Sequence, residues 1–359
     1  MTESEILYWL SISGLSVRKQ AEILLKAGGI KSLADKFVHD EDIRNFVGNK
    51  HEFMKRSLCD EFIKESLSKL KKDGINVATQ LNPLFPEKLK QREVCAPFVL
   101  YYKGDLDLLN SDCVAVVGTR AVSAYGKRMT EKFVKTLVEN DFTIVSGLAT
   151  GVDGIAHQTA LANNGKTIAV LGSGLNYVNP VGHTQLYNDI IDNGGLIISE
   201  YRPEMTATKY TFPERNRLIS GISKGVLIVE AGEKSGSLIT ASFALEQGRD
   251  VFAIPGNLEN SKSVGTNKLI ASGAYLVCSG EDICSHYGKK SDAKKNKSVD
   301  LLSKEEKSIY YALKDETSFD ELVDKTGILP NVLSSLLIKL EMEGYIKKTY
   351  MDNYLITEK

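Results

Sequence analysis

The stretch Cys113-Val-Ala-Val-Val117-Gly-Thr-Arg120 decides the fold, because it is an uninterrupted apolar run that ends in a glycine turn. Similar runs recur further along the chain, separated by segments of helical periodicity: Thr143–Ser146, Thr167–Leu171, Leu196–Ser199, Val226–Glu230, Val251–Ile254 and Tyr275–Val277. Strands that are apolar throughout are buried on both faces of a sheet. Residues 111–285 are therefore predicted to form an α/β domain, Rossmann-like and doubly wound, with a mostly parallel sheet.

Residues 1–80 are predicted to form a small all-α domain of the SAM/helix-hairpin-helix-like kind. The turn Ile12–Ser16 can present backbone N–H groups to a phosphate, or it belongs to an ordinary helical hairpin with glycine caps. Residues 81–110 are expected to be a connector that ends in a strand-like segment, Phe98–Tyr102. The helices expected from apolar spacing are Glu5–Leu10, Ser16–Ala27, Ile30–Phe37 and Glu52–Lys72.

The C-terminal part is predicted to be a winged helix, residues 301–359, joined by a basic flexible linker, residues 286–300. The expected elements are the helices Lys304–Lys314, Ser318–Thr326 and Pro330–Glu343, followed by a hairpin of Tyr345–Thr349 and Asn353–Ile356. This domain has 8 Lys and no Arg against 11 Asp and Glu, and its third helix carries only Lys339 as a cation. We therefore expect protein contacts or autoregulation from it, although Lys347 and Lys348 leave weak DNA contact open.

Composition is typical of a folded protein of two or three domains that needs no metal or cofactor. With 45 Lys and Arg against 46 Asp and Glu, the formal charge is −1, so no overall basic field attracts a polyanion. The five cysteines include no C-x-x-C pair and the five histidines no pair at i, i+4, which argues against a metal site. Since neither a secretory signal nor an apolar run of about 18 residues is present, we expect a cytoplasmic protein.

In an open α/β sheet, ligands bind where strands end and helices begin. The first such loop, Gly118-Thr119-Arg120, offers backbone N–H groups and a guanidinium to a phosphate; alternatively it is a tight turn whose Arg120 is solvated or paired. The loop lacks the G-x-G-x-x-G pattern of dinucleotide sites. Lys166 precedes a strand instead of opening a helix, which excludes a P-loop.

Two later loops offer further chemistry. Asp153 and His157 are one helical turn apart and could form an acid–base pair, but no nucleophile accompanies them, so capping and packing roles are favoured. The segment Lys209–Arg217 combines three cations with Tyr210 and Phe212, which can track phosphates and stack bases. Alternatively, its aromatic rings are core and its arginines bridge Glu200 and Glu214.

Several motifs, in order, resemble the DNA-processing protein A (DprA/Smf) family: Val-Val-Gly-Thr-Arg at 116–120, Ser-Gly-Leu-Ala-x-Gly-x-Asp-x-x-Ala-His at 146–157, Phe-Pro-x-Arg-Asn-Arg at 212–217, Glu-Ala…Ser-Gly-Ser-Leu-Ile-Thr-Ala at 230–241 and Ala-Ile-Pro-Gly at 253–256. The resemblance implies a non-enzymatic, homodimeric protein that binds single-stranded DNA without sequence specificity. It also implies that the protein promotes loading of the RecA recombinase for homologous recombination in natural transformation. Single-strand binding protein is a further candidate partner, and no membrane is involved.

Together, the motifs and the resemblance give a set of expected DNA-binding residues: Gly118, Thr119, Arg120, Gly147, Gly174, Lys209, Phe212, Arg215, Asn216, Arg217, Ser235, Gly236 and Ser237. Structural or pocket roles are expected for Asp153, His157 and Glu230. In the loop that is here Asn179-Pro-Val-Gly-His183, the family usually has Tyr-Pro and then an Asn, often beside a lysine used for DNA. This loop has no lysine or arginine, so its DNA contact is in doubt.

Two other functions remain open. One is a Rossmann-like nucleotide hydrolase resembling the LOG/lysine-decarboxylase-like family, although Pro255-Gly-Asn-Leu258 lacks that family's second glycine and Gly-Thr. The other is a protein–protein adaptor built around the winged helix.

Overall fold

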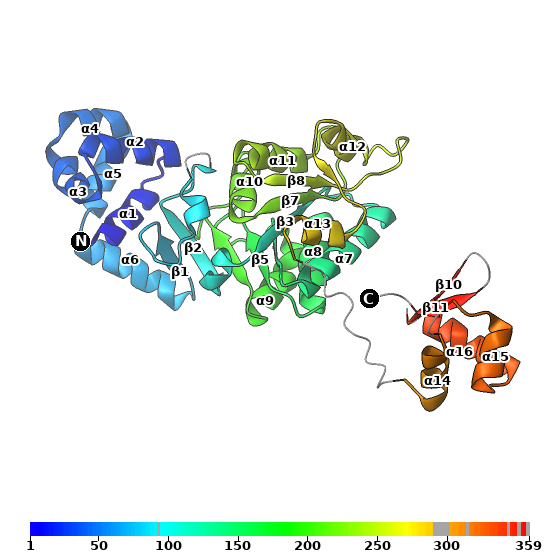
Figure 1. Ribbon diagram of the computed structural model, residues 1–359. Coiled ribbons are helices and arrows are strands. Elements are labelled where there is room, and N and C mark those ends of the chain that lie inside the picture. Colours follow the sequence, from blue (N-terminus) through cyan, green and yellow to red (C-terminus); the bar gives the residue numbers. More distant parts are fainter. Residues whose placement is uncertain (92–93, 290–301, 314–315, 343–344, 350–352, 357–359) are drawn as a thin grey trace. The chain divides into compact units, whose positions relative to one another are not determined.

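The computed structural model describes residues 1–91, 94–289, 302–313, 316–342, 345–349 and 353–356. The chain divides into two compact units, Met1–Lys289 and Lys290–Lys359 (Figure 1).

A nine-stranded sheet forms the centre of the first unit, in the order β1-β2-β6-β5-β4-β3-β7-β8-β9. The neighbours from β6 to β9 pair in parallel, whereas β1, β2 and β6 pair antiparallel with one another. This confirms the mostly parallel sheet and all seven strands predicted over 111–285. The strands are β1 (Asn76–Thr79), β2 (Val99–Gly104), β3 (Cys113–Val117), β4 (Thr143–Ser146), β5 (Thr167–Val170), β6 (Leu196–Ser199), β7 (Gly225–Ile228), β8 (Asp250–Ala253) and β9 (Tyr275–Leu276).

Helices cover both faces of this sheet, as the alternation of apolar side chains along β3 requires. Val114 and Val116 pack with Phe133 of α7 in one core, whereas Ala115 and Val117 pack in another with Leu218 of α10. A strand that is buried on both sides needs apolar residues at every position. The helices are α7 (Ala124–Glu139), α8 (Val152–Ala162), α9 (Thr184–Asp192), α10 (Thr211–Ile222), α11 (Gly236–Glu246), α12 (Val264–Ala271) and α13 (Gly280–His286).

The chain reverses its direction across the sheet between β3 and β7. From β3 it continues through β4, β5 and β6 on one side, and then it returns to place β7 and β8 on the other side. The loops that follow β3 and β7 therefore lead to opposite faces of the sheet but begin side by side: the Thr119 N–H donates to the Glu230 carbonyl at 2.8 Å. Such a switch point is where open α/β sheets bind ligands.

The N-terminal segment is helical as predicted as far as Lys72, but Asn76–Thr79 at its end form strand β1, and one predicted helix is divided in two. The apolar spacing of Glu52–Lys72 predicts a single helix, but the helix is broken at Cys59, whose backbone is extended (φ −142°, ψ 131°). Asp60 and Glu61 then occupy the first turn of a new helix, where carboxylates are favoured by the helix dipole. The helices are α1 (Glu3–Ile12), α2 (Val17–Ala27), α3 (Ile30–His39), α4 (Glu41–Val47), α5 (His51–Ser57) and α6 (Asp60–Lys72).

These helices share a core with the sheet. Trp9 and Phe37 belong to the same buried cluster as Tyr101 of β2 and Ile197 of β6. The segment expected to be a connector thus supplies a strand of the main sheet, at the place where the sequence predicts the strand-like Phe98–Tyr102. Domain boundaries near residues 80 and 110 remain a proposal.

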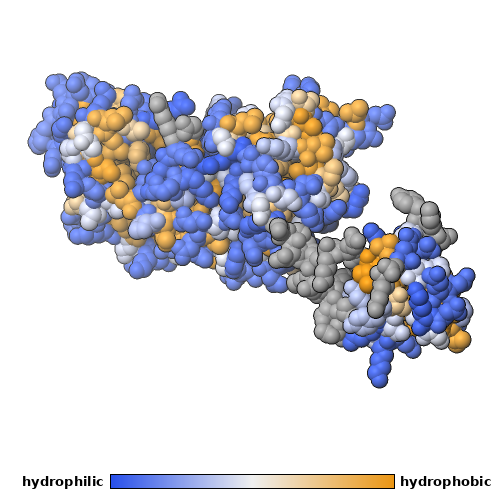
Figure 2. Space-filling model, in the orientation of Figure 1, coloured by the Kyte–Doolittle hydropathy of each residue, from blue (hydrophilic) through white to orange (hydrophobic). Residues whose placement is uncertain are grey.

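The far edge of the sheet exposes apolar side chains. Tyr275 and Leu276 form β9, the last strand in the order, and are 49% and 52% exposed. Leu258, in the loop before α12, is also exposed. In Figure 2 hydrophobic residues gather around α12 and the neighbouring end of the sheet.

The second unit is a winged helix, as predicted. It contains α14 (Lys304–Ala312), α15 (Phe319–Thr326) and α16 (Pro330–Met342), followed by the hairpin of β10 (Ile346–Lys348) and β11 (Tyr354–Ile356). Residues 290–300 of the expected linker, and Lys314 and Glu343 at predicted helix ends, lie outside the described residues. Within the described part of the chain, no helix is both long and apolar enough to cross a membrane.

Candidate nucleic-acid interface

A groove of about 480 Å³ lies at the switch point of the sheet, and we call it the rim groove. It is formed by the loops after β3 and β4 and by the first turns of α10 and α11. Ten of the thirteen expected DNA-binding residues line it: Gly118, Thr119, Arg120, Lys209, Phe212, Arg215, Asn216, Ser235, Gly236 and Ser237. Gly147, Gly174 and Arg217 do not belong to this lining.

Two exposed cations, each beside an aromatic ring, mark the mouth of the rim groove. The Arg120 guanidinium carbon lies 5.2 Å from the centroid of the Phe212 ring. The Lys209 ammonium lies 5.0 Å from the centroid of the Tyr210 ring. Among the described residues, neither cation forms a salt bridge with a carboxylate. Both are therefore available to an anionic ligand.

Helix N-termini add to the positive potential of the rim groove. Ser235 caps α11 by accepting a hydrogen bond from the Ser237 N–H at 3.4 Å, and the space beside Gly236 is open. The first turn of α10 faces the same groove. Unsatisfied N–H groups at helix N-termini attract anions. The one carboxylate in the described lining belongs to Asp153, which is buried.

Arg215 is buried at the groove and holds the loops that form it. One guanidinium nitrogen, Nη1, donates to the Gly147 carbonyl at 3.0 Å and also to the Val170 carbonyl, while Nε donates to Asn216 Oδ1 at 3.1 Å. Burial lowers the Arg215 pKa to about 10, although nearby Asp153 opposes the shift, so the side chain stays charged at neutral pH. Its donors hold the ends of β4 and β5 in place.

Gly147 has a steric role under the same groove. A Cβ atom there would lie 2.6 Å from Arg215 Nη2 and 2.8 Å from Asp153 Oδ2, closer than non-bonded contacts allow. Gly174 is similar, since a Cβ atom would lie 2.0 Å from the Arg202 carbonyl oxygen. Both glycines permit close packing of loops and do not line the groove.

Arg217 is engaged inside the protein. Its two terminal nitrogens donate to the two carboxylate oxygens of Glu200 at 2.6 and 2.7 Å, and both side chains are buried. Burial would lower the Arg217 pKa, but the carboxylate of Glu200 outweighs it and raises the pKa. The alternative in which an arginine bridges to Glu200 is therefore the one found for Arg217.

Asp153 and His157 form no acid–base pair. Asp153 Oδ2 accepts a hydrogen bond from the Gly147 N–H at 3.1 Å, and burial raises its pKa. His157 Nδ1 lies 2.6 Å from Thr167 Oγ1, and burial lowers the His157 pKa to about 3, so the ring is neutral. The N-cap of α8 is Gly151 and not Asp153, which corrects the capping role that the sequence suggests.

Glu230 holds the start of α7. Its Oε2 accepts a hydrogen bond from the Ser123 N–H at 2.9 Å, and its Oε1 one from the Ser123 hydroxyl at 2.5 Å. Ser123 is the N-cap of α7. The Glu230 side chain is buried and does not line the rim groove, so its carboxylate is occupied by the fold.

Sequence reasoning missed several lining residues, among them Ala149, Ile239 and Thr240. Ile239 and Thr240 lie three and four residues after Gly236 on α11, a spacing that returns side chains to the same helix face. The helical spacing of Ile239 and Thr240 from Gly236 is the sequence signal that could have identified them.

The loop Asn179–His183 lies outside the groove and contributes no residue to its lining. His183 holds this loop in place, since its Nδ1 is 2.9 Å from the Leu148 carbonyl oxygen.

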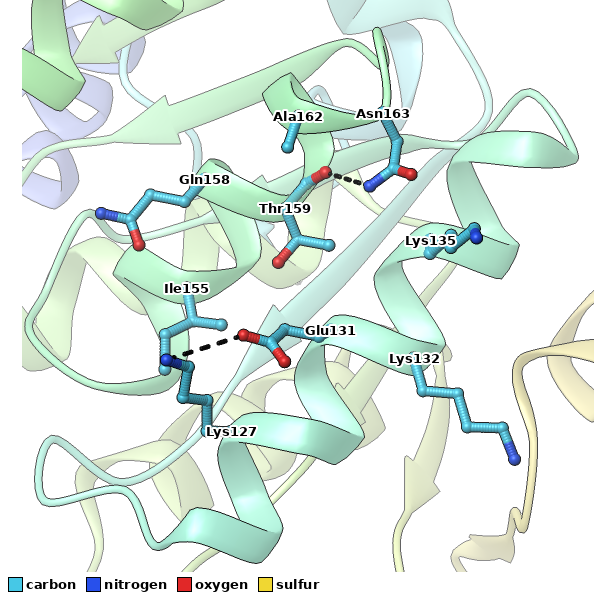
Figure 3. A pocket seen from close by; sticks show the side chains of 9 residues that line it. All are labelled: Lys127, Glu131, Lys132, Lys135, Ile155, Gln158, Thr159, Ala162 and Asn163. Carbon is cyan, nitrogen blue, oxygen red and sulfur yellow. Dashed lines mark hydrogen bonds and ion pairs between the residues drawn. The ribbon is translucent and has the colours of Figure 1, made fainter.

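A second hollow, of about 560 Å³, lies between α7 and α8 (Figure 3). Lys127 is engaged there with Glu131 at 3.9 Å, and the apolar residues Ile155 and Ala162 belong to the lining. No aromatic ring of the described residues lines it. The rim groove, with its free cations and its aromatic ring, suits a nucleic acid better than this hollow does.

Comparison with known proteins gives close relatives. The family profile of DNA recombination-mediator protein A matches residues 76–288, and that of the DprA winged helix domain matches residues 293–349. The chain is 50% identical to Protein Smf of Escherichia coli K12 over 187 residues, which are 52% of this chain and half of that protein's length. It is 41% identical to DNA processing protein DprA of Bacillus subtilis over 218 residues, 60% of this chain and 73% of that protein.

Two solved structures are similar. The X-ray structure of DNA processing protein A from Streptococcus pneumoniae gives a TM-score of 0.67 at 39% identity and covers 79% of this chain and 98% of that one. A structure of DNA processing protein A from Helicobacter pylori, described for its single-stranded DNA binding mode, gives a TM-score of 0.53 at 33% identity, with coverage of 60% and 96%.

Proposed function

The chain belongs to the DNA recombination-mediator protein A family, and from this membership and the rim groove we propose that it binds single-stranded DNA without sequence specificity. The observation that carries the proposal is the pairing of two unengaged cations with aromatic rings, Arg120 with Phe212 and Lys209 with Tyr210. Cations hold phosphates, and rings stack any base.

Preference for single strands follows from the place of Phe212 in the site. Phe212 is half-buried in the groove lining, beside Gly172 in the loop after β5 and the Arg120 guanidinium. Only an unpaired base can turn out of its strand and reach such a ring, whereas the bases of a duplex stay stacked. Contacts to phosphates and to base planes carry little sequence information, which supports binding that does not depend on sequence.

The cellular role is proposed from the family. We propose that the chain promotes loading of RecA on single strands for homologous recombination in natural transformation, acting in the cytoplasm, without catalysis, and meeting single-strand binding protein on its substrate. Filament formation by RecA on strands pre-coated with single-strand binding protein tests this directly. No stimulation by the chain would refute it.

A homodimer is part of the same proposal. β9 is an edge strand of the described sheet, with exposed Tyr275 and Leu276. Pairing of this edge with a second copy would bury both side chains and satisfy the unpaired backbone groups. Sedimentation velocity over a concentration series checks for the dimer.

The hydrolase alternative finds less support. Glu230 is the carboxylate whose loss would test this activity, and both of its oxygens are engaged with Ser123 outside the groove. Incubation of the protein with nucleoside monophosphates tests this alternative. Base release that is abolished by Glu230→Gln would overturn the proposed function.

The decisive experiment is fluorescence anisotropy with labelled single- and double-stranded oligonucleotides of one sequence over a salt series. We expect tighter binding of the single strand and a linear fall of log K with log salt, with a slope of about 0.7 per phosphate contacted. Equal affinity for the two forms, or affinity that salt does not change, would contradict the proposal.

A further inference from the structure

Tyr210 lies immediately outside the rim groove, and its ring faces solvent. The side chain is 71% exposed, and Tyr210 is the N-cap residue of α10, two positions before Phe212. It does not belong to the groove lining, whereas Lys209 and Phe212 on either side of it do. A ring with this exposure contributes little to the core, so its place in the fold leaves it free for a ligand.

The backbone beneath the ring is held in one conformation. Thr208 Oγ1 accepts hydrogen bonds from the N–H groups of Tyr210 and Thr211, both at 3.3 Å. In return, the Thr208 N–H donates to Thr211 Oγ1 at 2.9 Å. A residue in a fixed turn loses little conformational freedom when a ligand binds it. These hydrogen bonds therefore fix the backbone from which the Tyr210 ring projects beside the groove.

Tyr210 repeats the arrangement found at Phe212. The Lys209 ammonium lies 5.0 Å from the Tyr210 centroid, and the Arg120 guanidinium lies 5.2 Å from the Phe212 centroid. Each pair offers a face for a base and a charge for the adjoining phosphate, which are the two parts of a nucleotide. Two such pairs side by side suit two successive units of one strand.

The separation of Tyr210 and Phe212 along the chain is consistent with each ring stacking on a different base. Residues two positions apart are joined by at most about 7 Å of chain, and on a helix they face different directions. The rings of Tyr210 and Phe212 thus cannot enclose one base between them, but bases one or two nucleotides apart can reach both.

We propose that Tyr210 is a second base-stacking platform, which takes the nucleotide next to the one held in the rim groove. The inference rests on the proposed function and deepens it, because it extends the footprint of the strand beyond the groove. It assigns to Lys209 a position between two nucleotides, where its ammonium can serve the phosphate that links them.

The test compares Tyr210→Ala and Tyr210→Phe with a control, Tyr311→Ala, whose side chain is 62% exposed in the second unit. The probes are a fluorescein-labelled dT 20-mer and an abasic 20-mer with the same backbone. We expect Tyr210→Ala to weaken binding of the dT 20-mer about 5- to 100-fold, and Tyr210→Phe and Tyr311→Ala to change it less than about twofold. Binding of the abasic strand and the salt slope should stay as in the unaltered chain.

Three outcomes would overturn the inference: unchanged dT binding by Tyr210→Ala, an equal loss for Tyr210→Phe, or an equal loss on the abasic strand. The last would assign the ring to positioning Lys209 instead of a base. If the unaltered chain binds neither strand, the proposed function fails, and the inference fails with it. Melting temperatures measured in parallel should agree among all variants, because the ring is exposed.

Discussion

The guanidinium of Arg120, from the loop after β3, lies 5.2 Å from the centre of the Phe212 ring in the first turn of α10. These residues come from distant parts of the sequence and meet across the switch point of the sheet. A cation–π contact needs no hydrogen bond from the guanidinium, so its N–H groups can still donate to a phosphate. This geometry distinguishes Arg120 from the two arginines of α10, which are engaged inside the protein.

Arg120→Ala and Lys209→Ala should each weaken binding of single-stranded DNA and reduce the slope of log K against log salt by about 0.7 to 1, because each removes one phosphate contact. Anisotropy over a salt series measures both effects. Lys132→Ala, an exposed lysine on α7 outside the rim groove, is the matched control and should leave the slope unchanged. If all three variants behave alike, the cations act only through net charge.

Replacement of Arg217 should reduce the stability of the protein and leave the salt dependence of DNA binding unchanged. Arg217→Ala leaves the buried carboxylate of Glu200 without its partner, and loss of one member of a buried pair costs about 3–5 kcal/mol of unfolding free energy. The double variant Arg217→Met/Glu200→Leu should recover much of this loss, since no charge remains unpaired. Urea unfolding measures the stability, and anisotropy on the folded protein should show a normal salt slope. A reduced slope would mean that Arg217 contacts phosphate after all.

Gly147→Ala should destabilise the protein by about 1–3 kcal/mol, because the added methyl group would collide with Arg215 and Asp153. Gly236→Ala is the matched control: it adds the same atom where no neighbour lies within 4 Å. Thermal unfolding compares the two. A similar melting temperature for both variants would show that the side chains around Gly147 shift without cost.

The free energy of unfolding should decrease as the pH falls below about 6.5, because of the buried His157. Burial lowers the His157 pKa to about 3 in the folded state, whereas an unfolded chain takes up the proton near 6.5. Between these values only the unfolded state is protonated, so the stability lost is about 1.4 kcal/mol per pH unit. Urea unfolding between pH 7 and 5 should show this loss.

His157→Gln removes the titrating group, and its stability should fall less steeply with pH than that of the unaltered chain. His39→Gln serves as the control for removal of a histidine elsewhere. An identical pH dependence in His157→Gln and the unaltered chain would show that other groups are responsible.

The strands of the central sheet were predictable because strands buried on both faces consist of uninterrupted apolar residues. β3, β4 and β6 have the same bounds as the predicted apolar runs. β1 was missed, since Asn76–Thr79 is an edge strand that is buried at only two of its four positions. The break before α6 was missed too, because Cys59 is neither Gly nor Pro and gives no signal of a helix end.

The candidate site was located from the sequence, but the roles of its residues were not. Loops after parallel strands meet at one edge whatever their side chains are, so Gly118–Arg120, the segment Lys209–Arg217 and Ser235–Ser237 are expected together. The structure brings the first and last of these, with Lys209, Phe212, Arg215 and Asn216 of the segment, into the lining of one groove. From the sequence alone, four cations are equally good candidates for phosphate contacts there: Arg120, Lys209, Arg215 and Arg217. Within the described part of the chain, Arg120 and Lys209 form no ion pair, whereas Arg215 and Arg217 are engaged inside the protein.

Periodicity and loop position are properties of neighbouring residues, and they sufficed for the sheet, the winged helix and the edge at which a ligand would bind. Whether a cation is free depends on which distant group reaches it. Arg217 meets Glu200 at the end of β6, and Arg215 meets the carbonyl groups at the ends of β4 and β5. Arg120 lies over the Phe212 ring and forms no ion pair with any residue that the structure describes. Those partners converge only when the sheet is assembled, because the energy of a charge is set by burial and distance in space and not by spacing along the chain.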